Sequence, residues 1–311
     1  MKKFIIIIIF CVHINIIKNY FLIYFIMINI LYLCNWNHPK NHNALIHYKN
    51  IKFTQVTTLN SIDLSKFNAV YSPDISINTN LYPNTKFIFG PHFSIFPEKN
   101  QIDMISNPNT IYIQPSEWVV KLWKDYTVCN NLKIKVLPFG VETEKFTEIK
   151  PINERNKVFI YYKSRAPQDL EFIKYFLNNK NIEYTVFSCY DKYNEDDYLT
   201  YLHDSIYGIW VDAHESQGFA LEEALSCNVP LFVWNIKSMN QEYNSTYNDI
   251  PATTIPYWDE RCGEFFYNNN DIEEKFNLFL SRINTYKPRE YVLENLSMEE
   301  CEKKLIKLVS L

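Results

Sequence analysis

From Met27 onward, short runs of apolar residues alternate with segments in which apolar residues recur at helical spacing. Continuous apolar runs are typical of strands buried on both faces of a sheet, and the helical spacing is typical of amphipathic helices. Their alternation predicts βα units around a parallel sheet, and therefore an α/β fold. The predicted strands cover residues 28–33, 69–71, 86–89, 111–113 and 135–137 in the first half and 157–162, 184–187, 207–211, 231–234 and 253–255 in the second. The predicted helices cover residues 168–178, 195–203, 221–227 and 272–283.

Two series of βα units are separated by residues 145–156, a charged segment that contains Pro151. We interpret this segment as a linker, because polar and proline-containing segments are typical of domain boundaries. A chain of 311 residues has the length of about two domains, and its 47% of hydrophobic residues can fill two cores. The sequence therefore predicts two α/β domains, residues 27–145 and residues 146–311.

The first 26 residues have a different pattern. A basic start precedes an apolar run, as in a signal peptide, but no small-residue cleavage site follows. Lys18 lies inside the apolar stretch, where a charged residue opposes membrane insertion by roughly 3 kcal/mol. We therefore favour a hydrophobic extension or weak anchor over residues 1–26, with the folded part beginning at Met27. The alternative is a true membrane-spanning segment, and residues 4–33 are the stretch through which the chain would contact a membrane.

Charge and cysteine content exclude several classes of protein. A formal net charge of −4 argues against a nucleic-acid partner, because such partners require a basic face. The seven cysteines form no CxxC pair and no cysteine–histidine cluster with the spacing of zinc ligands, so we expect no metal site. Cysteines scattered in this way favour a reduced compartment, and hence the cytoplasm.

The most informative segment is residues 214–233, with the sequence HESQGFALEEALSCNVPLFV. Its apolar residues after Gly218 form one stripe, which predicts a short helix. A glycine before a helix leaves free backbone N–H groups at the positive end of the helix dipole, which is a seat for phosphate. Glu215 lies in the loop before this helix, and Glu223 lies at the edge of its buried face. Two acceptors flanking one anion seat suit a sugar nucleotide, whereas an ordinary surface loop and amphipathic helix would leave Glu222 and Glu223 solvated.

This segment resembles a known family signature. Glu215 and Glu223 are separated by seven residues, and Glu223 begins the run Glu-Ala-Leu-Ser-Cys-x-Val-Pro; together they are similar to the signature of GT-B glycosyltransferases of family 4 (group 1). Residues 136–146 resemble the family's crossing from the N-terminal domain into the linker, and the whole resemblance covers about residues 111–235. It implies a GT-B architecture, two Rossmann-like domains with the active site in the cleft between them.

The resemblance also implies roles for individual residues. Glu215 would contact the donor sugar and act in catalysis, the backbone of Gly218 would meet the diphosphate, and Glu223 would bind the ribose hydroxyls. Three neighbours would line the same loop, namely Ser216, Gln217 and Phe219. The family pattern further implies retention of anomeric configuration and no essential metal or other cofactor.

The chain departs from the family pattern at other positions. Where the family has a Gly-Arg and a later lysine that hold the diphosphate, this chain has Lys163 and Arg165, and the sequence does not decide which of them takes the arginine place. Two solvated surface charges are the alternative interpretation. His92, in a Gly-Pro turn, is the candidate for the histidine that family members often place near the donor sugar, although a lone histidine in such a turn is more often structural. The family's glycine-rich turn after the first strand is replaced by Cys-Asn-Trp-Asn-His.

The residues and the resemblance together predict a glycosyltransferase that moves a sugar from a nucleotide diphosphate donor, UDP- or GDP-linked, to a glycan, lipid or protein acceptor. Two alternatives remain open. One is an epimerase or hydrolase of GT-B fold that acts on a sugar nucleotide. The other is a non-catalytic carbohydrate-binding or interaction protein on the same scaffold, which the missing glycine-rich turn favours and the intact glutamate pair disfavours.

Overall fold

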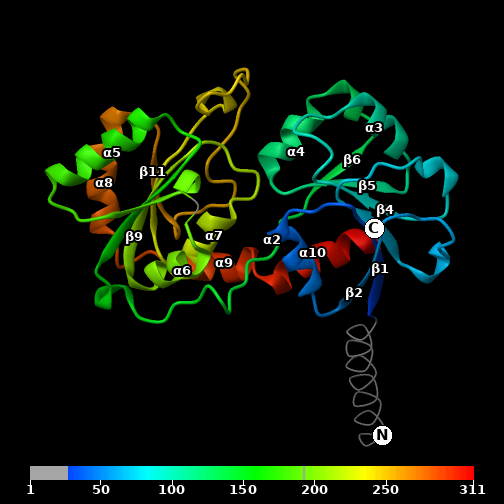
Figure 1. Cartoon of the computed structure of the whole chain (residues 1–311), viewed down its shortest axis with the longest axis horizontal. Helices are drawn as coiled ribbons and strands as arrows, with labels where there is room; N and C mark the ends of the chain where they lie inside the picture. Colours follow the sequence, from blue (N-terminus) through cyan, green and yellow to red (C-terminus); the bar gives the residue numbers. More distant parts are fainter. Residues whose placement is uncertain (1–26, 192) are drawn as a thin grey trace, which may run out of the picture.

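The computed structural model of the chain describes residues 27–191 and 193–311. Figure 1 shows two α/β lobes side by side, each built around one sheet. The sheet of the first lobe consists of β1 (Ile28–Leu33), β2 (Ile51–Val56), β3 (Ala69–Ser72), β4 (Phe87–Phe89), β5 (Thr110–Gln114) and β6 (Lys133–Val136). All its strand pairs are parallel, in the order β2-β1-β3-β4-β5-β6. The strand order therefore reverses between β1 and β3, which creates a crevice beyond their carboxyl ends.

The sheet of the second lobe consists of β7 (Lys157–Lys163), β8 (Thr185–Ser188), β9 (Ser205–Asp212), β10 (Leu231–Trp234) and β11 (Gly263–Phe266). It is also fully parallel, in the order β11-β10-β9-β7-β8. Here the order reverses between β7 and β9. Crevices at such reversals are where open α/β sheets bind ligands.

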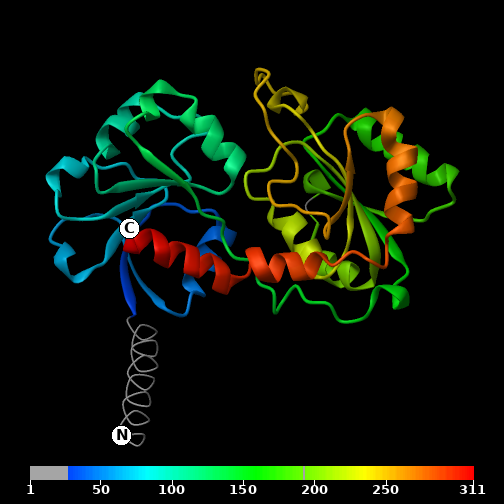
Figure 2. The same cartoon turned by 180° about the vertical axis from the view of Figure 1, so that it is seen from behind.

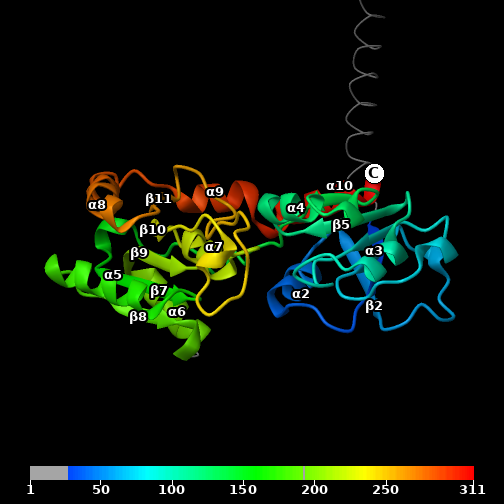
Figure 3. The same cartoon turned by 90° about the horizontal axis from the view of Figure 1, so that it is seen from above.

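Helices cover both faces of each sheet, as the view from above in Figure 3 shows. In the first lobe, α2 (Pro39–Ile46) packs on one face, and α3 (Lys99–Ile105) and α4 (Glu117–Lys124) pack on the other. In the second lobe, α6 (Glu195–Asp204), α7 (Phe219–Ser226) and α9 (Pro288–Asn295) share one face, and α5 (Pro167–Asn179) and α8 (Ile272–Ser281) share the other. Two-sided coverage explains the continuous apolar strands, whose residues are buried on both faces.

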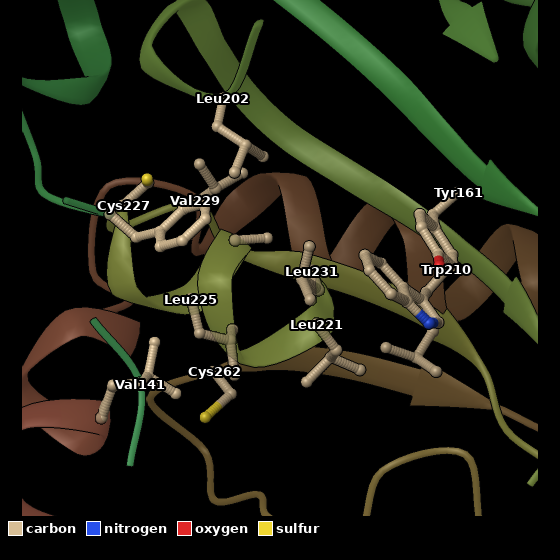
Figure 4. Close-up of a cluster of buried hydrophobic side chains, with 14 of the residues drawn as sticks. Val141, Tyr161, Leu202, Trp210, Leu221, Leu225, Cys227, Val229, Leu231 and Cys262 are labelled. Atoms are coloured by element: carbon tan, nitrogen blue, oxygen red, sulfur yellow. The ribbon is translucent and has the colours of Figure 1, made fainter. Parts of the chain in front are cut away.

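The core beneath α7 is rich in aromatic and branched side chains (Figure 4). Tyr161 of β7 stacks on Trp210 of β9 with 4.0 Å between ring centroids. Leu221 and Leu225, one helical turn apart on α7, are buried against the same cluster. Burying an aliphatic side chain of this kind stabilises the fold by about 1.5–3 kcal/mol, so this stripe fixes the orientation of α7 on the sheet.

The last helix, α10 (Met298–Ser310), lies along the first lobe, and Figure 2 shows the chain returning there from α9 of the second lobe. Ser297 caps it by accepting a hydrogen bond from the Glu300 N–H at 3.3 Å. Its apolar stripe, which includes Cys301 and Leu305, is buried in the core of the first sheet. The apolar stripe of α10 thus packs on the first lobe, although α10 belongs by sequence to the predicted C-terminal domain over residues 146–311. The boundary between residues 145 and 146 stays a prediction.

The predicted α/β class with two Rossmann-like sheets is confirmed. The predicted strand at residues 253–255 is wrong, because this segment is a loop between Pro251 and Pro256. Its polar groups form hydrogen bonds with a side chain instead of pairing with a neighbouring strand. The Thr253 hydroxyl and the Thr254 N–H both donate to Asn235 Oδ1 at 2.9 Å. The fifth strand of the second sheet is β11 instead.

Within residues 27–191 and 193–311, no helix has both the length and the apolar character needed to cross a membrane. Of the stretch considered for membrane contact, residues 28–33 form β1, most of which is buried in the first sheet. The rest of that stretch up to residue 26, together with the expected extension over residues 1–26, lies outside the described residues.

Candidate active site between the lobes

A cavity of about 690 Å³ lies between the two lobes. The second lobe contributes the end of β7, the loop after β9 and the first two turns of α7. The first lobe contributes the loop after β1, the start of α2, the Gly-Pro turn after β4 and one face of α4. The cavity therefore opens at the carboxyl ends of strands in both sheets, as expected for an α/β ligand site. The candidate residues that line it are His92, Lys163, Glu215, Ser216, Gln217, Gly218, Phe219 and Glu223.

Lys163 and Asp212 end the two strands that flank the reversal in the second sheet. They are direct partners in the register of β7 and β9, so their side chains lie on the same face. Lys163 Nζ forms an ion pair with Glu215 Oε1 and lies 4.0 Å from Asp212 Oδ2. Burial alone would lower the pKa of Lys163, but the charges of Glu215 and Asp212 outweigh it and hold the pKa above its ordinary value. Lys163 is therefore a permanent cation facing the cavity.

The start of α7 faces the same space. Gly218 precedes the helix with φ of 87°, a left-handed conformation that favours glycine. This turn brings the first backbone N–H groups of α7, which have no partner within the helix, to the cavity wall formed by Ser216 and Phe219. An anion here would meet the helix N-terminus and the ammonium group of Lys163 together.

Glu223, on the second turn of α7, is 4% exposed and faces the cavity. Its carboxylate pairs with Lys40, which comes from α2 in the first lobe. Lys40 also pairs with Glu195 at the start of α6, and Lys145 donates to the other oxygen of Glu195 at 2.8 Å. Burial raises the pKa of Glu223 to about 7, while the charge of Lys40 opposes this effect. The expectation that Glu222 and Glu223 would both be solvated in an ordinary surface helix does not hold, since both are buried.

His92 lies in the cavity wall of the first lobe, in the turn after β4. Its Nε2 is 3.0 Å from Asn37 Oδ1 and 3.1 Å from Asn41 Nδ2, and its ring meets the edge of Trp36 at 4.8 Å. Burial lowers the pKa of His92 to about 4. The imidazole is therefore neutral at pH 7 and is held in place by two asparagines.

The side-chain amide of Gln217 forms hydrogen bonds with residues of both lobes. Its Oε1 accepts a hydrogen bond from the Phe139 N–H at 3.0 Å, and its Nε2 donates to Glu222 at 2.8 Å. Phe139 lies in the core of the first lobe, and Glu222 is fully buried. Gln217 therefore ties the loop after β9 to the first lobe, and its side chain is already engaged there.

Arg165 is not brought to the cavity with the other candidates. Its Nε donates to Asp169 at 2.9 Å, and its guanidinium lies 4.7 Å from the centre of the Trp234 ring. Ser164, between the two basic residues, has φ of 54°, so the chain turns sharply after β7. Of the two cations that the sequence left open for the diphosphate, Lys163 is the one that lines the site.

Sequence reasoning missed three charged residues of this site, Lys40, Glu195 and Asp212. Lys40 and Glu195 each lie near the start of a helix far from the signature segment, so only the fold brings them to Glu223. Asp212 carried a readable signal, because it is a carboxylate at the end of an apolar strand and three residues before Glu215.

Comparison with known proteins adds information on the fold. No protein-family model matches the sequence, and no curated protein matches it. Among solved structures, the N-terminal domain of Candida albicans trehalose-6-phosphate phosphatase superposes with a TM-score of 0.54 at 11% identity, over 91% of this chain and 96% of that one. The apo form of the lipopolysaccharide outer core galactosyltransferase WaaB superposes with a TM-score of 0.50 at 13% identity, over 91% of this chain and 99% of that one.

A third structure is a mutant of S. aureus TarM in complex with Fondaparinux, alpha-GlcNAc-glycerol and UDP. It superposes with a TM-score of 0.50 at 15% identity, over 78% of this chain and 56% of that one. The chain has the GT-B glycosyltransferase fold. At these identities the likeness establishes the arrangement of the GT-B lobes, and the chemistry has to be argued from the cavity.

Proposed function

We propose that this GT-B protein is a glycosyltransferase that moves a sugar from a nucleotide diphosphate donor to an acceptor hydroxyl, with retention of anomeric configuration. One observation carries the proposal. Lys163, the N-terminus of α7 and two carboxylates, Glu215 and Glu223, share one wall of the cavity between the lobes. A cation and free N–H groups between two acceptors match a diphosphate that has hydroxyl-bearing sugars on both sides.

In the proposed complex, the diphosphate lies at the start of α7 beside Lys163. Glu223 accepts hydrogen bonds from the ribose hydroxyls, and Glu215 accepts from the donor sugar. UDP is the nucleotide bound in the TarM structure of the same fold, and a UDP- or GDP-linked donor is our expectation for this chain. In the structure, the ammonium group of Lys40 is paired with the carboxylate of Glu223. The side chain of Lys40 therefore has to move aside before the ribose can bind to Glu223.

The proposed reaction exchanges one bond at the anomeric carbon. The bond from this carbon to the diphosphate oxygen breaks, and a bond from the acceptor hydroxyl oxygen to the same carbon forms. The acceptor proton leaves with the diphosphate. Lys163 and the α7 N-terminus stabilise the negative charge that develops on the leaving diphosphate, which is where preorganised positive groups contribute most to catalysis. His92 faces the donor sugar from the first lobe, and the rest of that wall, which includes exposed Trp36, receives the acceptor.

A second candidate function is a non-catalytic carbohydrate-binding protein. The observation that favours it is Lys40, which fills the position at Glu223 where the ribose would bind. An epimerase or hydrolase acting on the sugar nucleotide would use the same wall. The need for an acceptor distinguishes these activities from transfer.

The experiment is a screen for turnover in which the products are identified by their masses. UDP- and GDP-linked hexoses are incubated with the full chain, with and without a mixture of glycan and lipid acceptors. We expect sugar to appear on an acceptor, and the Glu215→Gln variant to lower turnover at least about tenfold, since it removes a negative charge beside the reacting sugar. Glu264→Gln, a matched change at a residue paired with Arg282, serves as the control.

Three results of this screen would contradict the proposal. Free sugar released with and without acceptor would indicate a hydrolase, and isomerised sugar nucleotide would indicate an epimerase. Intact donor throughout would favour the non-catalytic candidate.

A further inference from the structure

Asp212 is buried and only partly satisfied. It is 1% exposed, and its Oδ1 accepts a hydrogen bond from the Ala213 N–H at 2.7 Å. Its Oδ2 has no hydrogen-bond partner among residues 27–191 and 193–311. A buried polar atom without a partner costs about 1–3 kcal/mol, so such an atom calls for an explanation in function.

The orphaned oxygen faces the cation of the site. Asp212 Oδ2 lies 4.0 Å from Lys163 Nζ, too far for a hydrogen bond. Lys163 is instead engaged by Glu215 on the cavity side. Two carboxyl groups therefore compete for one ammonium group, and burial with the nearby charge of Glu215 holds the pKa of Asp212 well above its ordinary range.

If the carboxylate of Glu215 moves away from Lys163, Asp212 becomes the nearest carboxyl group to the ammonium group. Under the proposed function, Glu215 turns from Lys163 towards the hydroxyls of the donor sugar. A lysine ammonium has three N–H donors, so Lys163 can then hold Asp212 and a diphosphate oxygen at once. A shift of about 1 Å would bring Lys163 within hydrogen-bond range of Asp212 Oδ2.

We propose that Asp212 is a positioning residue that takes Lys163 over from Glu215 when the donor binds, which frees Glu215 for the sugar. The proposal rests on the proposed function, because it requires a sugar nucleotide at this wall. Asp212 is not among the residues that line the cavity, so it acts on the donor through Lys163. The effect of Asp212 should therefore appear as a difference in Kd between sugar nucleotides and nucleotides without a sugar.

The test uses Asp212→Asn, which keeps the shape and removes the group that can ionise. Because an amide cannot become a carboxylate when Lys163 approaches, Lys163 stays paired with Glu215, and the sugar of the donor contributes less to binding. We measure Kd for UDP, GDP and their hexose conjugates, together with kcat and KM. We expect the ratio of the diphosphate Kd to the sugar-diphosphate Kd to fall about threefold or more and kcat to fall about tenfold, with the bare diphosphate bound as tightly as by the parent or tighter.

Asp169→Asn is the matched control, because Asp169 pairs with Arg165 outside the cavity. It should leave both the Kd ratio and kcat within about twofold of the parent. Equal behaviour of the two variants would overturn the role of Asp212. A parent chain that binds none of the nucleotides would instead overturn the proposed function, so the two failures are distinguishable.

A structural measurement keeps the proposal testable if Asp212→Asn fails to fold. In a crystal structure of the parent chain with a sugar nucleotide, Lys163 Nζ should lie within about 3.2 Å of Asp212 Oδ2, with Glu215 on the sugar. Lys163 still paired with Glu215 in that complex would contradict the handover.

Discussion

Glu223 and His92 face the same cavity from opposite lobes, and burial changes the proton affinity of both. Burial raises the pKa of Glu223 to about 7 and lowers the pKa of His92 to about 4, because a charged side chain is disfavoured away from water in either case. Lys40 compensates Glu223 with an opposite charge, whereas Asn37 and Asn41 offer His92 only neutral partners. Glu223 therefore faces the cavity as one half of an ion pair between the lobes, and His92 faces it as a neutral group.

The neutral state of His92 makes stability depend on pH. The unfolded chain binds a proton at this histidine below its ordinary pKa of about 6.5, while the folded chain binds it only below about 4. Stability is therefore lost as the pH falls from about 6.5 towards 4. We expect His92→Gln to remove about 2 kcal/mol of the loss in unfolding free energy between pH 7.5 and pH 5, measured by urea unfolding.

His47→Gln provides the comparison, because His47 is an exposed histidine. The same change in pH dependence in both variants would show that His92 is not buried as a neutral group.

At the scale of elements, the turn into α7 depends on Gly218. An added Cβ would meet nothing closer than Glu215 Cβ at 3.6 Å, so there is room for it and only the φ of 87° opposes it. We expect Gly218→Ala to lower the unfolding free energy by about 1–2 kcal/mol, the cost of a left-handed conformation for a residue with a side chain.

Gly263, at the start of β11, is the contrasting case. A Cβ there would lie 1.9 Å from the backbone oxygen of Leu231, so we expect Gly263→Ala to prevent folding of the second sheet. Thermal unfolding of both variants checks the pair. A Gly263→Ala protein as stable as Gly218→Ala would contradict this account of the sheet.

Long buried strands were predictable because two-sided burial leaves an uninterrupted apolar run, as at residues 207–211 within β9. β2 was not predictable on this ground, since it is an edge strand whose residues after Ile51 are exposed or half-buried. α10 was missed because its apolar stripe is narrow and its many charges face solvent. Which lobe would cover that stripe depends on tertiary packing.

The candidate site was also predictable only where its residues are close in the sequence. The start of α7 at Gly218 could be predicted, because the glycine and the helix that follows it lie within a few residues of each other. Lys40 could not, because α2 and α7 are far apart in the chain and meet only across the cavity. Arg165 was an equal candidate with Lys163 until the turn at Ser164 separated them.

On the scale of the whole molecule, the loop that carries Glu215 is held from the other lobe. Trp118 Nε1 of α4 donates to the backbone oxygen of Glu215 at 2.8 Å. The Tyr257 hydroxyl of the second lobe donates to the backbone oxygen of Pro115. The position of Glu215 thus depends on the contact between the two lobes.

We therefore expect Trp118→Phe to lower kcat strongly while it lowers the unfolding free energy only slightly. The variant keeps an aromatic side chain but replaces the indole by a smaller phenyl ring, and it loses one hydrogen bond, about 1 kcal/mol of stability, so that the Glu215 loop is released from α4. Trp234→Phe is the matched control, because Trp234 Nε1 donates to Tyr267 within the second lobe at 3.1 Å. We expect a fall in kcat of about tenfold or more for Trp118→Phe alone. Equal rates in the two variants would show that lobe contact does not set the loop.

The central claim is that the wall formed by Lys163, α7 and Glu223 binds a nucleotide diphosphate. The most direct test is a calorimetric titration of the full chain with UDP and GDP, each with and without a linked hexose, repeated with Glu223→Gln. We predict binding of at least one of these nucleotides by the parent chain and about tenfold weaker binding by the variant, which corresponds to 1.4 kcal/mol. No heat of binding with any of the nucleotides, or equal affinity in parent and variant, would contradict the account.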